Sequence, residues 1–167
     1  MRFTTEKIKT PDELARIVRA LQAEGLTIVH CHGVFDLVHL GHVNYFEEAK
    51  KRGDFVYVGV IADAYVRKGP GRPWFSEIQR LTWVAALESV DYVVLNEEEG
   101  PWSLMRTIRP NLYTKGEDHL PMLADPSHGI HEDIRVMESI GGRVIFTPSL
   151  LIHSSDLFRS LGLERDR

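Results

Sequence analysis

The hydrophobic and polar positions of the chain follow two spacings, one typical of strands and the other of helices. Five short apolar runs predict strands at residues 27–31, 55–61, 91–95, 111–115 and 143–147. The run at 55–61 is apolar almost throughout, as expected for a central parallel strand that is covered on both faces. Apolar residues at helical spacing predict helices at 41–52, 76–88, 101–108 and 130–140, with a last helix through 154–161.

Residues 1–25 contain one further predicted helix, whose beginning and end are both marked in the sequence. Thr10 can cap the helix, Pro11 suits its first turn, and Glu13 completes a capping box with Thr10. Gly25 ends the helix at a position where glycine is common. The helix is plainly amphipathic, so we expect it to pack against the rest of the fold and to take no part in chemistry.

Strands that alternate with helices predict a doubly wound, Rossmann-like α/β fold with a five-stranded parallel sheet. We expect residues 1–167 to form a single domain, because the length suits one core and the sequence shows no repeat or linker. Residues 120–129 contain two prolines and a glycine and are expected to be an irregular insertion. Long loops of this kind often act as lids or partner surfaces.

Composition and charge narrow the class of protein. The chain has 167 residues, 43% of them hydrophobic, a formal net charge of −4 and one cysteine, Cys31. The apolar runs are too short to span a membrane, and the N-terminus lacks the apolar segment of a secretion signal. A single cysteine cannot form an internal disulfide, so we expect a cytoplasmic protein. The negative net charge argues against nucleic acid as a partner.

Eight histidines raise the question of a metal site. His30, Cys31 and His32 are adjacent in the sequence, but successive residues of a strand point to opposite faces of the sheet. These three side chains therefore cannot surround one ion, and we expect no metal site made by the protein alone.

The stretch from Gly33 to His42 is the strongest candidate for chemistry. It joins the end of a predicted strand to the start of a helix, where parallel sheets bind their ligands. Gly33 lets a phosphate approach the backbone, and the start of the helix directs free N–H groups at the same place. His39 and His42, with Gly41 between them, can both point at one anion and offset charge that develops in a transition state.

Three other polar segments should reach the same edge of the sheet. Lys68 lies in a basic loop at 66–73, rich in glycine and proline, that follows the strand at 55–61. Residues 115–119 end another strand, and Ser154 and Ser155 follow the strand at 143–147. Their convergence on one edge is better support for a phosphate site than any of them alone.

The same residues resemble a known family. The segment Gly33-Val34-Phe35-Asp36-Leu37-Val38-His39-Leu40-Gly41-His42 is similar to the H-x-G-H signature of the cytidylyltransferase-like nucleotidyltransferases. Lys68-Gly69-Pro70, Lys115-Gly116-Glu117-Asp118 and Gly141-Gly142-Arg143-Val144 are most similar to the adenylyltransferase domain of ADP-heptose synthase. The resemblance covers nearly the whole chain in one order, so it is far more specific than the H-x-G-H motif.

This resemblance implies a nucleotidyltransferase that joins a nucleoside monophosphate to a small phosphorylated acceptor and releases pyrophosphate. His39, His42 and Lys68 would act in catalysis, and Lys68 and Arg80 would hold the substrate. Mg²⁺ would be held mainly by the triphosphate, and family members are often homodimers. The nucleotide would be bound by the signature and by the later polar segments, at Gly33, Val34, Phe35, Asp36, Gly41, Lys115, Gly116, Asp118, Ser154 and Ser155.

Some alternatives remain open at this point. Asp36 could be a metal ligand or could hold its loop by hydrogen bonds to the backbone, and the second is the preferred interpretation. Arg80 could form an ion pair on a helix surface. ATP and a sugar phosphate such as heptose 1-phosphate are the favoured substrates, and CTP with a polyol phosphate or phosphonate is the alternative. A nucleotide-binding sensor without turnover is the alternative of another class.

Overall fold

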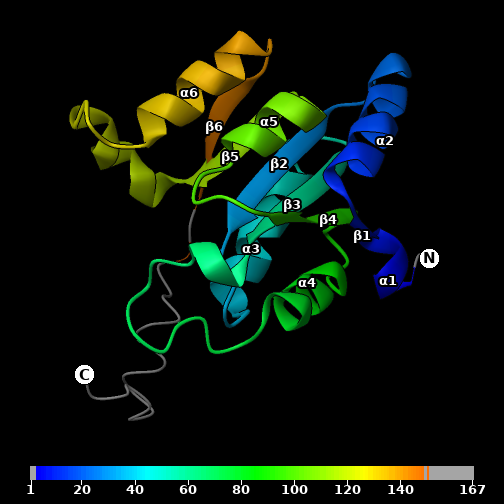
Figure 1. The fold of residues 1–167 in the computed structure, drawn as a ribbon. Helices are drawn as coiled ribbons and strands as arrows, with labels where there is room; N and C mark the ends of the chain where they lie inside the picture. The colour runs from blue at the N-terminus through cyan, green and yellow to red at the C-terminus, as the bar shows by residue number, and fades with distance from the viewer. Residues whose placement is uncertain (1–2, 149, 151–167) are drawn as a thin grey trace.

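The computed structural model describes residues 3–148 and 150 of the chain. Within them, six parallel strands form one sheet in the order β1-β4-β3-β2-β5-β6 (Figure 1). The expected Rossmann-like α/β class is confirmed. The strands are β1 (Ile8–Lys9), β2 (Ile28–Gly33), β3 (Phe55–Ile61), β4 (Tyr92–Asn96), β5 (Leu112–Gly116) and β6 (Arg143–Thr147).

The sequence prediction of five strands was wrong by one, because it missed β1. This strand contains only Ile8 and Lys9, which pair with Val93 and Val94 at the edge of the sheet. Two residues are too few to produce a recognisable hydrophobic period, so only the tertiary pairing with β4 makes them a strand.

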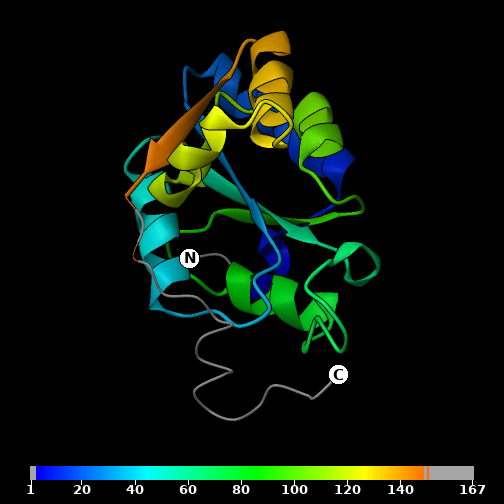
Figure 2. The same cartoon turned by 90° about the vertical axis from the view of Figure 1, so that its left-hand side faces the viewer.

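The helices form two layers, one on each face of the sheet (Figures 1 and 2). The helices α3 (Leu40–Lys50) and α4 (Glu77–Ala85) cover one face, and their buried residues share a core cluster with β2, β3 and β4. The other face carries α2 (Pro11–Ala23), α5 (Trp102–Ile108) and α6 (Ile130–Ser139). The short helices α1 (Thr4–Lys7) and η1 (Asp63–Tyr65) complete the N-terminal half.

The start of α2 has the capping box that the sequence predicts. Thr10 Oγ1 accepts a hydrogen bond from the backbone nitrogen of Glu13, and Glu13 Oε2 accepts one from the backbone nitrogen of Thr10 at 2.9 Å. Leu14 and Val18 on its inner face are buried, so the helix packs against the sheet as expected.

The segment expected to be an irregular insertion is partly helical. The 3₁₀ helix η2 runs over Glu117–Ala124 and takes up the first half of residues 120–129. Pro121 lies inside it, which a 3₁₀ turn tolerates better than the interior of an α-helix because fewer backbone bonds are lost. Leu120, Met122 and Leu123 are partly exposed on it.

The chain reverses its direction of growth across the sheet between β2 and β5. From β2 it proceeds through β3 to β4 on one side, and it then returns to build β5 and β6 on the other. A crevice at such a reversal, at the carboxyl ends of the strands, is where α/β sheets bind ligands. No helix of the described part of the chain is long and apolar enough to cross a membrane.

His30 is an unusual residue in the middle of β2. Its ring is fully buried, stacks on Tyr57 with centroids 4.4 Å apart, and neither ring nitrogen has a hydrogen-bond partner among the described residues. Burial lowers the pKa of His30 well below its usual value, with smaller contributions from His32 and Lys115. The folded protein therefore keeps this imidazole neutral, whereas the unfolded chain protonates it below about pH 6.5.

We predict that stability falls as the pH drops below about 6.5, because the unfolded state then binds a proton that the native state excludes at His30. Each such histidine contributes a slope of up to about 1.4 kcal/mol per pH unit. Urea unfolding of the parent and of His30→Phe between pH 5 and 7.5 measures this slope. The variant should show a shallower pH dependence, and His128→Gln, in a surface segment, should match the parent; equal slopes for parent and His30→Phe would contradict the assignment.

Candidate active site

A cavity of about 440 Å³ opens at the reversal point of the sheet, between the ends of β2 and β5. Most of the residues predicted for the site meet there. Its walls come from the turn after β2, the start of α3, the basic loop and the end of β5. They include Gly33, Val34, Phe35, His39, Gly41, His42, Lys68, Lys115, Gly116 and Asp118.

The turn after β2 has a strained backbone at the cavity wall. Phe35 has a φ of 52°, in the left-handed region that a side chain with a Cβ adopts at a cost. A Cβ on Gly33 would lie 2.9 Å from Cζ of Phe35, so only glycine fits beneath that ring. The turn thus brings the backbone of Gly33 to the surface of the cavity, where a phosphate can approach it closely.

His39 caps the α3 helix and stacks on His42. His39 Nδ1 accepts a hydrogen bond from the backbone nitrogen of Gly41 at 3.1 Å, and the two ring centroids are 3.9 Å apart. Since Nδ1 accepts, the ring is neutral and its proton is on Nε2, which can donate to a ligand. A Cβ on Gly41 would lie 2.9 Å from Cε1 of His39, which explains the glycine between the histidines.

His42 is neutral at physiological pH. Burial, with smaller contributions from His39 and Lys68, lowers its pKa to about 3, although a hydrogen bond with the backbone of Leu37 acts in the opposite direction. A neutral imidazole whose N–H faces the cavity can donate a hydrogen bond without adding charge near neutral pH. Such donors suit the stabilisation of phosphoryl oxygens.

Asp36 is buried and holds the basic loop; it is not a wall of the cavity. Its carboxylate accepts hydrogen bonds from Arg72 Nε at 2.6 Å, from Trp74 N at 2.8 Å and from Phe75 N at 3.1 Å. Asp36 does accept hydrogen bonds from backbone, as the preferred interpretation expects, but the segment that it holds is 72–75 and not its own loop.

Lys68 lies at the mouth of the cavity on the loop that Asp36 anchors. Partial burial of its ammonium and the nearby Arg72 lower the pKa of Lys68, whereas the charge of Asp36 raises it. The loop therefore brings an exposed cation next to His42.

Arg80 lies beneath the site and does not reach a ligand in it. Its guanidinium is fully buried and donates to the carbonyls of Phe75, Val34 and Ile61 and to Asp63 Oδ1 at 2.6–3.0 Å. The expected substrate contact is thus replaced by support of the turn through the carbonyl of Val34. The expected ion pair is present, with Asp63 Oδ1 at 2.7 Å, but the Arg80 guanidinium is fully buried and does not lie on the helix surface.

The end of β5 is joined to α3 by a buried chain of hydrogen bonds. Tyr45 Oη donates to the carbonyl of Thr114 at 2.7 Å and accepts from Thr114 Oγ1 at 2.8 Å. Thr114 Oγ1 also contacts Cys31 Sγ at 3.2 Å. These bonds align the two sides of the cavity. The predicted residues Ser154 and Ser155 lie outside the described residues.

Sequence reasoning missed several residues of the cavity wall. His32, Tyr45 and Glu99 line it together with the predicted residues, as does His119 from the polar segment 115–119. His32 immediately precedes Gly33 and Tyr45 follows His42 by three positions, so strand and helix spacing could have found both. Glu99 comes from the turn after β4, which the sequence did not link to the site.

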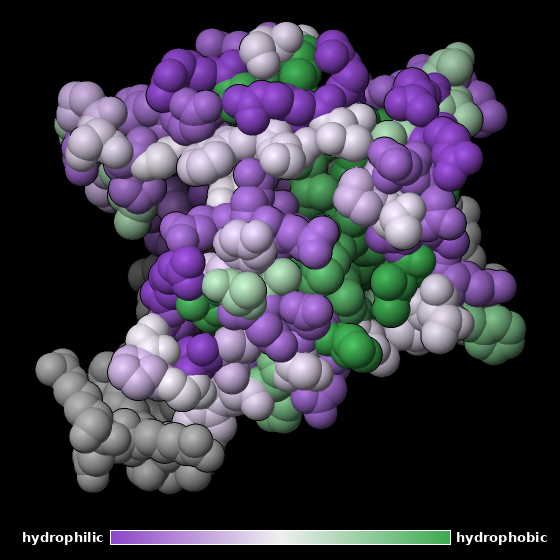
Figure 3. Space-filling model, in the orientation of Figure 1, coloured by the Kyte–Doolittle hydropathy of each residue, from purple (hydrophilic) through white to green (hydrophobic). Residues whose placement is uncertain are grey.

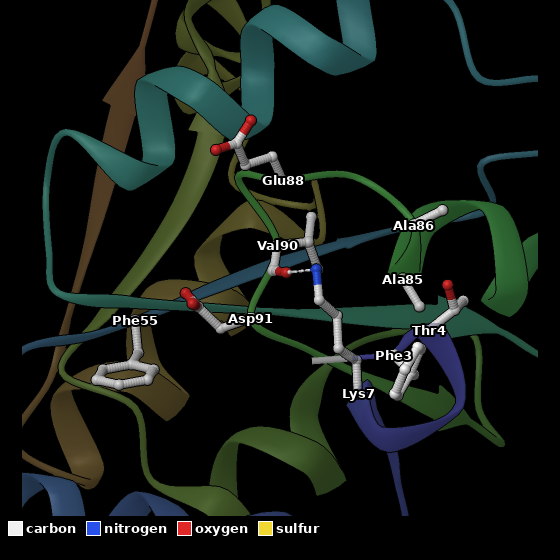
Figure 4. A pocket seen from close by; sticks show the side chains of 9 residues that line it. All are labelled: Phe3, Thr4, Lys7, Phe55, Ala85, Ala86, Glu88, Val90 and Asp91. Carbon is white, nitrogen blue, oxygen red and sulfur yellow. Dashed lines mark hydrogen bonds between the residues drawn. The ribbon is translucent and has the colours of Figure 1, made fainter. Parts of the chain in front are cut away.

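A second, larger cavity of about 700 Å³ lies at the amino ends of the strands (Figure 4). Figure 3 shows a hydrophobic strip framed by hydrophilic residues on the face of the molecule that Figure 1 presents. Among the described residues that line this cavity, one is basic, Lys7. Its ammonium donates hydrogen bonds to the carbonyls of Leu87 and Val90. A cation occupied in this way does not make a phosphate site, so the cavity between β2 and β5 is the candidate active site.

Comparisons with known proteins agree with this geometry. The sequence model described as Cytidylyltransferase-like matches residues 30–158. This chain belongs to the cytidylyltransferase-like family. The match begins in β2 and includes every residue predicted for the site, and the expected enzyme class, a nucleotidyltransferase, is confirmed at the level of the family.

Individual relatives of this cytidylyltransferase-like chain include the bifunctional protein HldE of Geobacter metallireducens, 43% identical over 83% of this chain. The HldE of Syntrophotalea carbinolica is 39% identical over 83%. The chain spans 27% of the length of each of these relatives. Among solved structures, the lipopolysaccharide core biosynthesis protein from Thermoplasma volcanium is similar with a TM-score of 0.63 and 28% identity, over 75% of this chain and 99% of that one.

We predict that Asp36→Asn loosens the basic loop, because an amide loses the charge-assisted bond to Arg72 and places a donor against backbone N–H groups. The loss of stability should be about 1.5–3 kcal/mol, the range for hydrogen bonds to a charged group. Urea unfolding measures it, and trypsin should cleave after Arg67 and Lys68 faster in the variant. Glu97→Gln, in the acidic turn, is the control; equal cleavage in both variants would mean that Asp36 does not hold the loop.

Proposed function

We propose that the chain catalyses transfer of a nucleoside monophosphate from a nucleoside triphosphate to the phosphate of a sugar phosphate, with release of pyrophosphate. ATP is the favoured nucleotide and heptose 1-phosphate the favoured type of acceptor. The observation that carries the proposal is the pair of stacked, neutral imidazoles of His39 and His42 beside Lys68 at the reversal point of the sheet.

The proposed reaction is an in-line displacement at the α-phosphorus. An oxygen of the acceptor phosphate forms a bond to the α-phosphorus, and the bond from this atom to the α–β bridging oxygen breaks. Such reactions need positioning and neutralisation of charge more than covalent chemistry. His39 Nε2 donates to an oxygen of the α-phosphate, His42 supports the same oxygens, and Lys68 offsets the charge from the loop.

The residues at the site suit phosphate and not a bare divalent cation. The described residues contain no cluster of three or more side chains able to hold a metal ion. Imidazole and ammonium nitrogens are also poor partners for Mg²⁺, which prefers oxygen. In the proposal Mg²⁺ arrives as the complex with the nucleoside triphosphate, and the phosphates are its ligands.

The proposed substrates follow from the relatives and from the sequence. The relatives named HldE support a heptose phosphate, and the solved neighbour, a lipopolysaccharide core biosynthesis protein, supports a role in making surface polysaccharide. Lys115, Gly116 and Asp118 border the expected place of the nucleoside. We also propose a homodimer and a cytoplasmic location, on the family resemblance and on the single cysteine.

Two alternatives differ from this proposal in ways that can be measured. A CTP-dependent enzyme with a polyol phosphate as acceptor would use the same histidines with a different base. A nucleotide-binding sensor would bind the triphosphate without releasing pyrophosphate. The retained His39, His42 and Lys68 in one cavity favour turnover, since simple binding does not need donors at the α-phosphorus.

We predict that pyrophosphate appears when the protein is supplied with Mg²⁺, ATP and a sugar 1-phosphate such as heptose 1-phosphate. The assay runs ATP, CTP, GTP and UTP against heptose 1-phosphate, glycerol 3-phosphate and inorganic phosphate. Excess EDTA should abolish turnover, because free triphosphate carries uncompensated charge. Turnover with CTP and glycerol 3-phosphate would support the first alternative, and nucleotide binding without turnover with any pair would support the sensor.

We predict that His39→Ala lowers kcat by a factor of about 100–1,000, the usual effect of removing one donor to a developing charge. The KM for the nucleotide should change much less, because the lost interaction strengthens in the transition state. His131→Ala, on α6 outside the cavity, is the matched control and should turn over like the parent. A His39→Ala variant with the parental kcat would refute the mechanism.

A further inference from the structure

A smaller cavity lies beside the candidate active site and shares its wall. It has a volume of about 220 Å³ and is lined by residues that include His32, Glu99, Trp102, Lys115, His128 and Asp133, and we call it the side cavity. His32, Glu99 and Lys115 line the active-site cavity as well. A ligand in the active-site cavity can therefore extend past these three residues into the side cavity.

The side chains of the side cavity are held in place by one another. Asp133 is buried at 3% exposure at the start of α6, and its Oδ1 accepts a hydrogen bond from Trp102 Nε1 at 2.9 Å. Its Oδ2 forms an ion pair with Lys115 Nζ at 3.0 Å. The carboxylate thus fixes the orientation of the indole and the position of the ammonium, and the cavity needs no rearrangement to receive a ligand.

His32 provides a neutral donor at the boundary between the cavities. Its Nε2 lies 3.1 Å from Asn96 Nδ2, and an amide nitrogen only donates, so His32 Nε2 accepts and Nδ1 carries the proton. Burial, and then the charge of Lys115, lowers the pKa of His32 to about 3. The ring therefore offers an N–H without a charge at physiological pH.

The balance of charge argues against a second phosphate in the side cavity. Its ammonium, Lys115, is paired with Asp133, and its other carboxylate, Glu99, is paired with Arg67, so the described lining offers no unpaired lysine or arginine to a phosphate. Carboxylates, a neutral imidazole and an indole face are instead the groups that bind hydroxyls and the C–H faces of a carbohydrate. The volume of about 220 Å³ is also below the range of about 300–1,000 Å³ typical of whole drug-sized ligands, so the side cavity suits one part of a ligand.

We propose that the side cavity binds the hydroxyl-bearing carbon skeleton of the acceptor, with Asp133, His32 and Trp102 as the residues that determine acceptor specificity. This inference rests on the proposed transfer to a sugar phosphate. The acceptor phosphate lies in the active-site cavity beside Lys68, and the sugar extends between His32 and Lys115. Asp133 accepts from hydroxyls while it holds Lys115 at the boundary.

The test compares Asp133→Asn with Glu132→Gln, its neighbour on α6, whose carboxylate pairs with Arg106 and Arg135 away from the cavity. Pyrophosphate release gives KM for the nucleotide and for heptose 1-phosphate separately. Asp133→Asn should raise the acceptor KM about tenfold, as the loss of one good hydrogen bond implies, and leave the nucleotide KM within about twofold. Glu132→Gln should match the parent in both. An unchanged acceptor KM, or an equal rise in both KM values, would overturn the proposal.

A binding measurement without turnover separates this proposal from the proposed function. Heptose 1-phosphate should quench the fluorescence of Trp102, with Trp102→Phe as the blank, and methyl phosphate, which has no hydroxyls, should not. Asp133→Asn should weaken the binding of heptose 1-phosphate about tenfold. Quenching without pyrophosphate release would refute the proposed function and keep the side cavity. Turnover without this quenching, or equal quenching by methyl phosphate, would refute the side cavity alone. The absence of both turnover and quenching would refute both proposals.

Discussion

The structure of the site depends on the hydrogen bonds that hold one strained turn, residues 34–36, in place. Phe35 has a positive φ, which costs energy unless neighbouring groups determine the conformation. Three contacts do so: Arg80 donates to the carbonyl of Val34, Trp83 Nε1 donates to that of Phe35, and Asp36 accepts from the backbone at Trp74 and Phe75. The segment 72–83 thus acts as a clamp that holds the turn in this conformation. The turn leads into α3 and so positions His39 and His42 at the cavity.

This clamp joins the turn after β2 to the loop that carries Lys68. The buried guanidinium of Arg80 also reaches the end of β3 through the carbonyl of Ile61. The two strands at the centre of the sheet and the start of α4 therefore meet at one side chain. Lys68 precedes Arg72 by four positions, on an exposed loop that Asp36 holds through its ion pair with Arg72. The arrangement thus combines histidines held by a buried clamp with a cation on an exposed loop.

Electrostatics separates the two cavities. The active-site cavity presents neutral imidazoles and two ammonium groups, Lys68 and Lys115, beside the carboxylates of Glu99 and Asp118, whereas the described lining of the side cavity has one ammonium, Lys115, which pairs with Asp133. Because His32 is neutral, it adds no charge that would draw a phosphate into the side cavity. In the proposal, charge thereby directs the phosphate of the acceptor to the active-site cavity and its sugar to the side cavity, before any specific hydrogen bond forms.

The sequence by itself determined the α/β class, five of the six strands of the described sheet and most of the wall of the active-site cavity. The strand period of two residues, the helical period of about 3.6 residues and the glycine-histidine spacing each involve only a few neighbouring residues. They can therefore be recognised in the sequence without knowledge of the fold. Only the tertiary structure decided the roles of Arg80 and Asp133 and the partners of Asp36. Several of these partners lie 31–46 residues away in the sequence, and a charged residue shows no sign in the sequence of whether it will be buried. The edge strand β1 depended likewise on a partner, Val93 and Val94, far along the chain.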